Sequence, residues 1–466
     1  MLNFRKLDLS DIELFKKYNG ENGEFSCEHT FLTLFIWRKW YQNMIATKGD
    51  TIYIKFGDGK NESFCLPFGS KDACDIYDIF EYCKDKKPVF WAQEGQSFDL
   101  FKPVLEKEGY CFFENRDSFD YIYERDSLAS LSGKKYHSKR NHIAAFSKKY
   151  NWRYESLGAG NIEKVRECAS LWYASKEPLG HGFLLEKESL FKILDNFNIF
   201  KNIKGGVIFV DDNAVAFTLG SAVNGDVFDI NIEKALPDFA TAYSVINREF
   251  ALKELSGFKY INREDDLGIE GLRKAKLSYS PERLIKKCTV KASETLSAKE
   301  QCRMIYRNSF CDDSQYFEEV LFKKCWKSAK YICEKDEVVS CLFALLCELT
   351  EGENSRTGTY IYAAATKESH RGKGYMTRLL KEVLEETNGF AVLRPANEKL
   401  CDFYAPFGFE TVEAKNSKEG APLLSPLAEY AELSQIFSPK ADGKLFTLMF
   451  NGKDKPSKIY FTDSLE

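Results

Sequence analysis

The chain has 466 residues, 44% of them hydrophobic and 29% charged, which excludes a long disordered protein and indicates several packed domains. Its net charge of −4 provides no overall attraction to nucleic acids or anionic membranes, and we expect no DNA partner. The 14 cysteines are scattered without a CxxC pair, and the N-terminus lacks the apolar run of a secretion signal, so we expect a cytoplasmic protein.

The first third of the chain predicts a hairpin followed by alternating helices and strands. Apolar runs separated by glycine-rich and charged turns indicate the strands, and apolar spacing of three to four residues indicates the helices. The expected elements are a hairpin at 51–69, a helix at 72–85, a strand at 87–94, a helix at 98–109 and closing strands within 110–124.

The middle third repeats this order with clearer turns. A short Asp/Asn turn and then Asn224-Gly225-Asp226 separate three apolar runs, and Asn-Gly is a strong hairpin turn. The expected elements are strands at 206–210, 214–223 and 227–235, a helix near 239–255, a strand at 258–262 and a helix near 268–275.

The last third contains the same order again. The expected elements are strands at 330–334 and 338–349, a polar loop at 350–358, a strand at 359–366, a helix from 376, a strand at 390–394 and a helix that leads to Tyr404. This weak internal repeat predicts three modules, 1–130, 131–290 and 291–466. We expect an α/β (α+β) chain in which each module is a mixed, mostly antiparallel sheet flanked by helices.

The sequence contains neither a membrane-spanning apolar run nor a metal-ligand spacing of histidines. The longest apolar run, residues 338–347, has about half the length needed to span a bilayer, so we expect no integral membrane contact. The histidines at 29, 137, 142, 181 and 370 show no metal-ligand spacing, and we predict no metal site.

A glycine-bearing loop in the last module carries the clearest chemical signal. It reads Arg371-Gly372-Lys373-Gly374-Tyr375-Met376 and joins an apolar strand to an amphipathic helix. Glycines there let the backbone approach a phosphate, and the free N–H groups of the helix start can donate to it. Arg371 and Lys373 add positive charge for a diphosphate.

This module resembles the GCN5-related N-acetyltransferase (GNAT) superfamily over about residues 330–412. The superfamily loop reads Arg/Gln-x-x-Gly-x-Gly/Ala, and Met376 replaces its final small residue. A second landmark of the superfamily, an Asn followed by Tyr and by Gly-Phe, is matched by Asn397, Tyr404 and Gly408-Phe409.

The resemblance implies acetyl-CoA (coenzyme A) as cofactor and transfer of its acyl group to an amine. It implies that the cofactor is bound by Ala365, Thr366, Arg371, Gly372, Lys373, Gly374, Tyr375, Met376 and Asn397. Tyr404 is the implied catalytic acid for the leaving thiolate, and a backbone N–H near Thr366 the implied oxyanion donor. The general base stays open, with Glu348 and Tyr362 as candidates.

The first two modules carry other motifs, including Cys27-Glu28-His29, Lys139-Arg140-Asn141 and the run Asn262 to Gly268. Over about residues 1–290 they resemble an uncharacterised bacterial family related to the C-terminal domain of phosphatidylglycerol lysyltransferases, which has a FemABX-like tandem acetyltransferase fold. The resemblance implies three GNAT-like modules in the whole chain. The substrate-binding candidates are Lys139, Arg140, Asn141, Glu233, Asn262, Arg263, Asp265 and Lys276.

The loop after the third strand of the second module, residues 236–243, contains no glycine and no basic residue. We therefore expect coenzyme A binding only in the last module. Three readings follow: an acyl-CoA-dependent N-acyltransferase acting on a small-molecule or peptide amine, an aminoacyl-tRNA-dependent transferase centred on the first two modules, or a non-catalytic recognition role for those modules. The basic residues of 134–153 keep tRNA open as a partner, and the sequence leaves the acceptor, the acyl chain length and the oligomeric state open.

Overall fold

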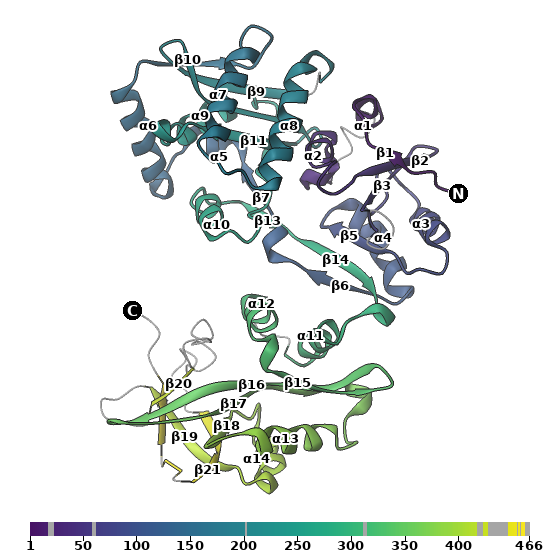
Figure 1. Cartoon of the computed structure of the whole chain (residues 1–466), viewed down its shortest axis with the longest axis vertical. Helices are drawn as coiled ribbons and strands as arrows, with labels where there is room; N and C mark the ends of the chain where they lie inside the picture. The colour runs from purple at the N-terminus through teal and green to yellow at the C-terminus, as the bar shows by residue number, and fades with distance from the viewer. Residues whose placement is uncertain are drawn as a thin grey trace. The chain divides into compact units, whose positions relative to one another are not determined.

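The computed structural model describes residues 1–16, 23–57, 62–200, 203–310, 315–416, 423–426, 446–453, 455–456 and 458–461. The chain forms two compact units, Met1–Thr295 and Leu296–Glu466 (Figure 1). Three clusters of buried apolar side chains lie within the first unit and two within the second.

The first sheet of the N-terminal unit has seven described strands, with one pair parallel and the others antiparallel. In spatial order they are β1 (Arg5–Lys6), β2 (Met44–Lys48), β3 (Thr51–Phe56), β4 (Ser63–Cys65), β5 (Val89–Gln93), β14 (Lys287–Ala292) and β6 (Tyr110–Glu114). The α-helices of this region are α1 (Ile12–Lys16), α2 (Phe31–Ile36), α3 (Ile76–Cys83) and α4 (Gln96–Lys107).

The second sheet of this unit also has seven described strands. In spatial order they are β13 (Arg283–Ile285), β7 (Asp120–Glu124), β12 (Tyr260–Asn262), β11 (Val227–Ala235), β10 (Asn213–Ala222), β9 (Ile203–Val210) and β8 (Trp152–Ser156). Its helices are α5 (Arg125–Ser130), α6 (His137–Lys149), α7 (Ile162–Ala174), α8 (His181–Asp195), α9 (Ala242–Lys253) and α10 (Glu270–Leu277).

The C-terminal unit contains one sheet with eight described strands. In spatial order they are β15 (Ala329–Glu334), β16 (Glu337–Glu351), β17 (Asn354–Thr366), β18 (Phe390–Leu393), β21 (Phe446–Gly452), β19 (Glu410–Asn416), β22 (Lys458–Phe461) and β20 (Leu423–Pro426). Side chains of α11 (Ala298–Ser309) and α12 (Gln315–Lys324) pack in one core cluster, and those of α13 (Tyr375–Glu386) and α14 (Glu398–Tyr404) pack in another.

The predicted repeat is confirmed in all three sheets. Three strands pair antiparallel in succession, and a fourth lies parallel to the third: β4 with β5, β11 with β12, and β17 with β18. Helices α3, α9 and α13 connect these parallel strands, because a chain must cross the sheet to start a parallel strand at the same end. The fold is thus mixed α/β, with mostly antiparallel sheets flanked by helices.

The two sheets of the N-terminal unit exchange strands across the expected module boundaries. β7 precedes residue 130 but pairs with β12 and β13 of the second sheet. β14 spans residue 290 but pairs with β5 and β6 of the first sheet. The structure differs from the expected division here because β14 satisfies the backbone groups of two strand edges that are otherwise unpaired.

The two sheets also share one core. All six residues of α2 are buried, and its five apolar side chains join α7 and α8 in a single apolar cluster with residues of both sheets. This common cluster explains why residues 1–295 form one compact unit. In the C-terminal unit, the polar loop expected at 350–358 lies instead in a hairpin whose pairing continues to Glu351 opposite Asn354. The start of β17 is largely exposed, so its polar composition is that of a solvated hairpin end.

Candidate functional site

The candidate site of the C-terminal unit begins where β17 and β18 stop pairing. Their parallel pairs end at Ile361 opposite Leu393, whereas β17 continues to Thr366. Pro395 soon follows Leu393 in the chain and has no N–H with which to extend the ladder. Beyond Leu393, no described strand pairs with this edge of β17.

A bulge bends β17 at this opening. The register with β16 shifts between Cys341 and Phe343, and Ala363 within the extra residues has a φ of 54°. A β-bulge leaves ladder groups unpaired and re-aims the strand. The small side chains of the alanine run that follows Tyr362 leave room beside the exposed strand edge.

The loop between β17 and α13 adopts a glycine-dependent conformation. Gly372 and Gly374 have φ values of 77° and 82°, in the left-handed region, and Gly374 caps the N-terminus of α13. A Cβ at either position would meet no described atom within 4 Å, so open space borders both glycines. This space adjoins the start of a helix, whose first N–H groups lack partners within the helix and suit an anion.

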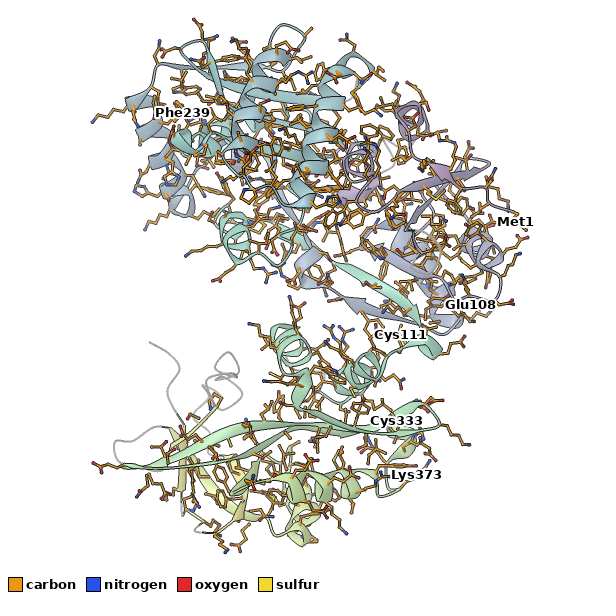
Figure 2. The ribbon with its side chains drawn as sticks, viewed as in Figure 1. Met1, Glu108, Cys111, Phe239, Cys333 and Lys373 are labelled. Atoms are coloured by element: carbon orange, nitrogen blue, oxygen red, sulfur yellow. The ribbon has the colours of Figure 1, made fainter. Side chains whose placement is uncertain are left out.

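The charged residues of the loop lie at its surface. Arg371 and Lys373 are exposed, and Figure 2 shows the Lys373 side chain at the outer end of this unit. Arg371 Nε donates to the carbonyl oxygen of Thr366 at 3.3 Å. Tyr375 and Met376 are partly buried against the core, so the bulk of Met376 lies on the core side of α13.

Two carboxylates beside the β15–β16 turn hold this loop in place. The Tyr375 hydroxyl donates to Glu334, and this hydrogen bond lowers the pKa of the Glu334 carboxyl. His370 Nε2 lies 3.6 Å from the same carboxylate, and Glu337 forms an ion pair with Lys367. The loop is therefore attached to its neighbouring hairpin at both ends.

The remaining C-terminal candidates lie around the same opening. Ala365 is buried, and Thr366 Oγ1 lies 3.0 Å from Ser340 Oγ of the adjacent strand. Asn397 caps α14, because its side-chain oxygen accepts from the Leu400 N–H at 3.2 Å.

Tyr404 lies at the end of α14 in the core cluster that contains α13. Its side chain is buried, and its ring centroid lies 5.1 Å from that of Phe403 and 6.0 Å from that of Phe409. Burial raises the pKa of the Tyr404 hydroxyl to about 12, so the phenol stays protonated at neutral pH.

The two candidates for the general base differ in position. Glu348 accepts from the hydroxyl of Ser355 and lies four residues along β16 from Ala344, the partner of Ile361. At about 3.3 Å per residue, Glu348 is some 13 Å from the strand opening. Tyr362 directly follows the last parallel pair, and its side chain packs in the cluster of α11 and α12.

The second module opens in the same way, with different chemistry. The parallel pairs of β11 and β12 end at Asp229 opposite Asn262, and β11 continues to Ala235. The following turn leads through Leu236 and Pro237 into α9 without glycine or base. At this opening the structure instead gathers buried charged and polar side chains.

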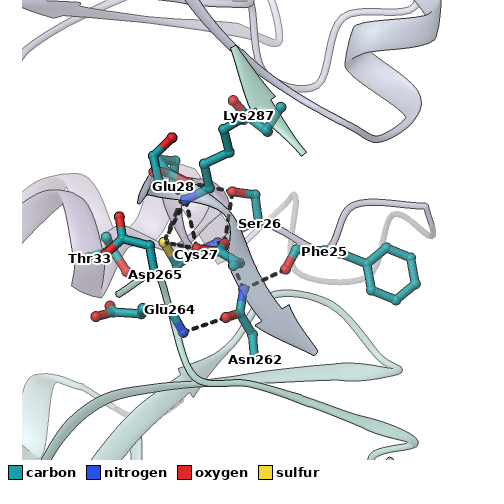
Figure 3. A network of polar contacts seen from close by, with 12 residues as sticks. Phe25, Ser26, Cys27, Glu28, Thr33, Asn262, Glu264, Asp265 and Lys287 are labelled. Carbon is teal, nitrogen blue, oxygen red and sulfur yellow. Dashed lines mark hydrogen bonds and ion pairs between the residues drawn. The ribbon is translucent and has the colours of Figure 1, made fainter. Parts of the chain in front are cut away.

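We call these side chains the polar seam (Figure 3). It contains Ser26, Cys27, Glu28, Thr33, Asp120, Asp229, Asn231, Asn262, Glu264, Asp265 and Lys287. The members come from α2 and the segment before it, from β7 and β11, from β12 and the segment after it, and from β14, so both sheets contribute. Its carboxyl groups outnumber its single lysine.

Lys287 lies at one end of the polar seam. Its ammonium is 2.7 Å from Glu28 Oε1, 2.8 Å from Asp120 Oδ1 and 3.4 Å from Cys27 Sγ (Figure 3). These contacts, with burial opposing them, lower the pKa of Glu28 to about 2 and hold the pKa of Lys287 well above its usual range. The ligand atoms of Cys27, Glu28 and Asp120 lie within 4.8 Å of one another, and the ammonium already contacts all three.

Asn262 links Lys287 and its partners to the strand opening. Its Nδ2 donates to Asp120 Oδ2 at 2.9 Å and to the Phe25 carbonyl oxygen at 2.8 Å. Its Oδ1 accepts from the Glu264 N–H at 2.6 Å. Both side-chain polar atoms of Asn262, a predicted substrate-binding residue, thus form hydrogen bonds within the protein.

The other end of the polar seam contains acceptors without donors. Asp229 accepts from Thr33 Oγ1 at 3.1 Å and from Asn231 Nδ2 at 2.7 Å, but its Oδ1 has no hydrogen-bond partner among the described residues. The Oδ1 of Asn231 is likewise unpartnered there. Burial raises the pKa of Asp229 and Glu264 well above the usual range and that of Asp265 to about 6.

Three further predicted residues meet beside the polar seam. Arg263 Nη2 pairs with Glu233 Oε1 at 2.8 Å, and the Arg263 guanidinium carbon lies 4.9 Å from the centre of the Tyr279 ring. Lys139 Nζ lies 3.9 Å from the same ring centre. Burial, and then the positive charge of Arg263, lower the pKa of Lys139.

The last three predicted residues have local partners. The Lys276 ammonium donates to carbonyl oxygens of residues 263–265. Arg140 donates to the carbonyl oxygen of Gly133 at 2.8 Å, and Asn141 contacts His137 one helical turn away at 3.2 Å. Arg140 and Asn141 are exposed on α6, and these contacts are with residues outside the polar seam.

Sequence reasoning missed Asp120, Asp229 and Lys287, which are buried charged residues of the polar seam. A signal for the two aspartates exists, because each interrupts an otherwise apolar or aromatic strand, VFDINI for Asp229 and FDYIYE for Asp120. A charge in a buried strand is costly unless it is paired. Lys287 carries no comparable local signal.

Comparisons with known proteins agree with both resemblances. Residues 22–291 match a family described as phosphatidylglycerol lysyltransferase, C-terminal, and residues 293–412 match an acetyltransferase (GNAT) domain. Both families are of the acyltransferase type. Among the described residues, no helix is both long enough and apolar enough to cross a membrane.

Solved structures of other proteins are similar to more than half of the chain. A conserved protein of unknown function from Bacteroides thetaiotaomicron is 32% identical, with a TM-score of 0.57 over 63% of this chain and 100% of its own. L-PGS from Bacillus licheniformis is 15% identical, with a TM-score of 0.45 over 63% of this chain and 94% of its own. An uncharacterized protein from Mycoplasmoides gallisepticum is 23% identical over 180 residues, and this chain spans 57% of that relative's length.

Proposed function

Because this chain belongs to the family of the phosphatidylglycerol lysyltransferase C-terminal domain and ends in an acetyltransferase domain, we propose that it is an acyl-CoA-dependent N-acyltransferase. In this proposal the C-terminal unit binds acetyl-CoA or a related acyl-CoA and acylates an amine of a small molecule or peptide. The first two modules bind the acceptor or perform a second transfer.

The observation that carries the proposal is the juxtaposition of an open strand edge and an open glycine loop. After Ile361, the edge of β17 has backbone groups available to an extended ligand such as pantetheine. The strand leads directly into the loop of Gly372 and Gly374, where the space for a Cβ is empty. Arg371 and Lys373 supply the charge that a diphosphate requires.

The residues at the opening suit the chemistry of aminolysis. The amine nitrogen attacks the carbonyl carbon of the acyl-CoA thioester. The coenzyme A sulfur then leaves as a thiolate. The backbone N–H of Thr366 is our candidate donor to the developing oxyanion. Tyr404 is our candidate acid, because a phenol with a pKa of about 12 is protonated at neutral pH and can give its proton to the sulfur. The amine loses its proton to a base, for which the position of Tyr362 is more favourable than that of Glu348.

A matched pair of glycine substitutions tests the proposal. Gly374→Glu places a side chain and a negative charge in the loop, and we expect calorimetry to show loss of acetyl-CoA binding by at least about 100-fold. Gly352→Glu is the control, since Gly352 also has a left-handed φ, of 62°, and open surroundings, but lies in the β16–β17 turn. If the two variants bind acetyl-CoA with equal affinity, the proposed donor site in the C-terminal unit is wrong.

A second candidate function is aminoacyl transfer from a charged tRNA, centred on the first two modules. The unpartnered oxygens of Asp229 and Asn231 favour it, because they can accept hydrogen bonds from an ammonium group of an aminoacyl substrate. The basic start of α6 supplies charge for phosphates. Salt-sensitive binding of tRNA to the full chain, weakened by Lys139→Ala but not by Gly374→Glu, supports this candidate, and the absence of such binding removes it.

A further inference from the structure

The N-terminal unit contains a cavity of about 630 Å³ that shares no residue with the proposed donor site of the C-terminal unit. Its lining includes Phe15 of α1, Phe68 and Lys71 of the segment after β4, and Asp99 and Leu100 of α4. This volume is within the usual range for small-molecule sites. All of these elements belong to the N-terminal unit.

The cavity lies at the strand opening of the first module. The parallel pairs of β4 and β5 end at Cys65 opposite Trp91. The chain after β4 then passes through Gly69, with a φ of 70°, toward α3, while the chain after β5 enters α4. In position within the repeat, this opening corresponds to the opening between β17 and β18.

Protein carboxylates already occupy the amide groups that would bind a diphosphate here. The Glu24 carboxylate accepts from both the N–H and the hydroxyl of Ser97 at the start of α4, each at 2.7 Å. Asp72 caps the turn before α3 by accepting from the Cys74 N–H at 2.8 Å. An anionic ligand would meet the Glu24 carboxylate instead of free amides at the start of α4, so this opening does not suit coenzyme A.

Two carboxylates of the lining, Glu24 and Asp99, and the aromatic walls favour a cation, and the carboxylates outnumber the single lysine of the lining, Lys71. Glu24 is held by Ser97 and by His29, whose Nδ1 lies 3.3 Å from Glu24 Oε2, so its charge is fixed at the cavity wall. Asp99 adds a second, exposed carboxylate at the rim. The Phe15 and Phe68 rings, with centroids 6.4 Å apart, provide apolar surface and can also attract a cation through their faces.

We propose that this cavity binds a small primary amine with an apolar body, its ammonium beside Asp99 and Glu24 and its apolar part against Phe15, Phe68 and Leu100. The site is independent of the proposed donor site, since it shares no residue with the C-terminal unit. The proposed ligand of this cavity is a cation, whereas the loop of the last module suits the anionic diphosphate of coenzyme A.

Calorimetry on the full chain with three probes of one shape tests the charge preference. The probes are phenethylamine, which is cationic at neutral pH, phenethyl alcohol, which is neutral, and hydrocinnamate, which is anionic. We expect phenethylamine to bind about tenfold or more tightly than the alcohol and hydrocinnamate to bind least tightly. Equal binding of the three probes, stronger binding of the alcohol or the anion, or no binding of the amine overturns the proposal.

Variants on α4 test the location. Asp99→Asn should weaken phenethylamine binding about fivefold or more without changing the affinity for phenethyl alcohol, because only the charge is removed. Glu106→Gln is the control, since Glu106 lies on the same helix, is about half exposed at 55% and does not line the cavity. Leu100→Trp should fill the cavity and abolish binding of both probes, with circular dichroism confirming the fold. If Asp99→Asn binds the amine as tightly as Glu106→Gln does, the assignment is wrong.

Discussion

Lys287 has an environment that few lysines have in proteins. Its side chain is 9% exposed and lies between Glu28 of the segment before α2 and Asp120 of the second sheet. Burying an ammonium is expensive, and its attraction to two carboxylates offsets that cost only while all partners are present. The residue therefore matters less as a source of net stability than as a group whose removal leaves two carboxylates unpaired.

Lys287→Met should strongly destabilise the N-terminal unit. We expect the free energy of unfolding in urea to fall by about 3–5 kcal/mol, because Glu28 and Asp120 lose their cation inside the protein. The neighbouring Lys286 is 56% exposed and pairs with Glu114 at the surface, so Lys286→Met should change stability by less than about 0.5 kcal/mol. Equal losses in the two variants would mean that the buried ion pairs contribute nothing specific.

Asp265 should make stability depend on pH in the opposite direction from Glu28. Burial raises the pKa of Asp265 from 3.8 to about 6, so the folded protein holds this proton more tightly than the unfolded chain. Its contribution is fully present below about pH 3.8 and is lost as pH rises through about 6. For Glu28, whose pKa is lowered from 4.5 to about 2, the contribution is present above 4.5 and is lost as pH falls toward 2.

Asp265→Asn should therefore gain stability relative to wild type as pH rises. We expect a relative gain of about 1–3 kcal/mol between acidic and neutral pH, measured by urea unfolding at several pH values. Asp212→Asn is the control, because the Asp212 side chain is 99% exposed. A variant that tracks wild type across this range would show that Asp265 is not held protonated by burial.

Among the elements, β10 and β11 of the second sheet approach each other closely at a glycine. Gly220 of β10 lies at a register shift against β11, and a Cβ there would come within 1.9 Å of the Asp229 carbonyl oxygen. Backbone atoms cannot yield as a flexible side chain can. The absence of a side chain at this position therefore sets how β11 runs into the polar seam.

Gly220→Ala should force β10 and β11 apart and destabilise the fold. We expect a loss of about 2–3 kcal/mol in the free energy of unfolding, together with a change in near-ultraviolet circular dichroism from the displaced strands. Gly225→Ala lies in the following turn, where a Cβ meets nothing within 4 Å, and should be within about 0.5 kcal/mol of wild type. If alanine is tolerated at Gly220 as well as at Gly225, β10 and β11 do not approach each other as closely as described.

At the scale of the whole molecule, the division of the chain follows its buried apolar clusters. None of the clusters of described residues crosses the boundary between Thr295 and Leu296. Within the N-terminal unit, by contrast, one cluster joins α2 to α7 and α8, and β7 and β14 are exchanged between sheets. The three repeats therefore form two units.

Fragments should reproduce this division. We expect 1–295 and 296–466, expressed separately, each to show a cooperative urea transition by circular dichroism. Fragments 1–130 and 131–290 should not, because the first contains β7 without its partners β12 and β13 and the second lacks β7, with both losing part of the shared core. A cooperative transition in 1–130 alone would show that strand exchange is not required for folding.

Local sequence patterns predict the repeated elements and the loop of the last module. Alternating apolar runs, Asn-Gly turns and helical spacing are local patterns, and they predicted the strand–helix order that the three sheets share. Gly372 and Gly374 mark this loop in the sequence. In the structure both have a left-handed φ, which a residue without a Cβ adopts most easily.

The exchange of β7 and β14 and the composition of the polar seam depend on long-range strand pairing, which local patterns do not specify. Cys27 and Lys287 are 260 residues apart, yet Lys287 Nζ lies 3.4 Å from Cys27 Sγ. No local pattern encodes such a contact, since the residues around Lys287 do not indicate which distant side chains it meets. Strand pairing placed these residues inside one core, and the cost of burying their charges required them to meet.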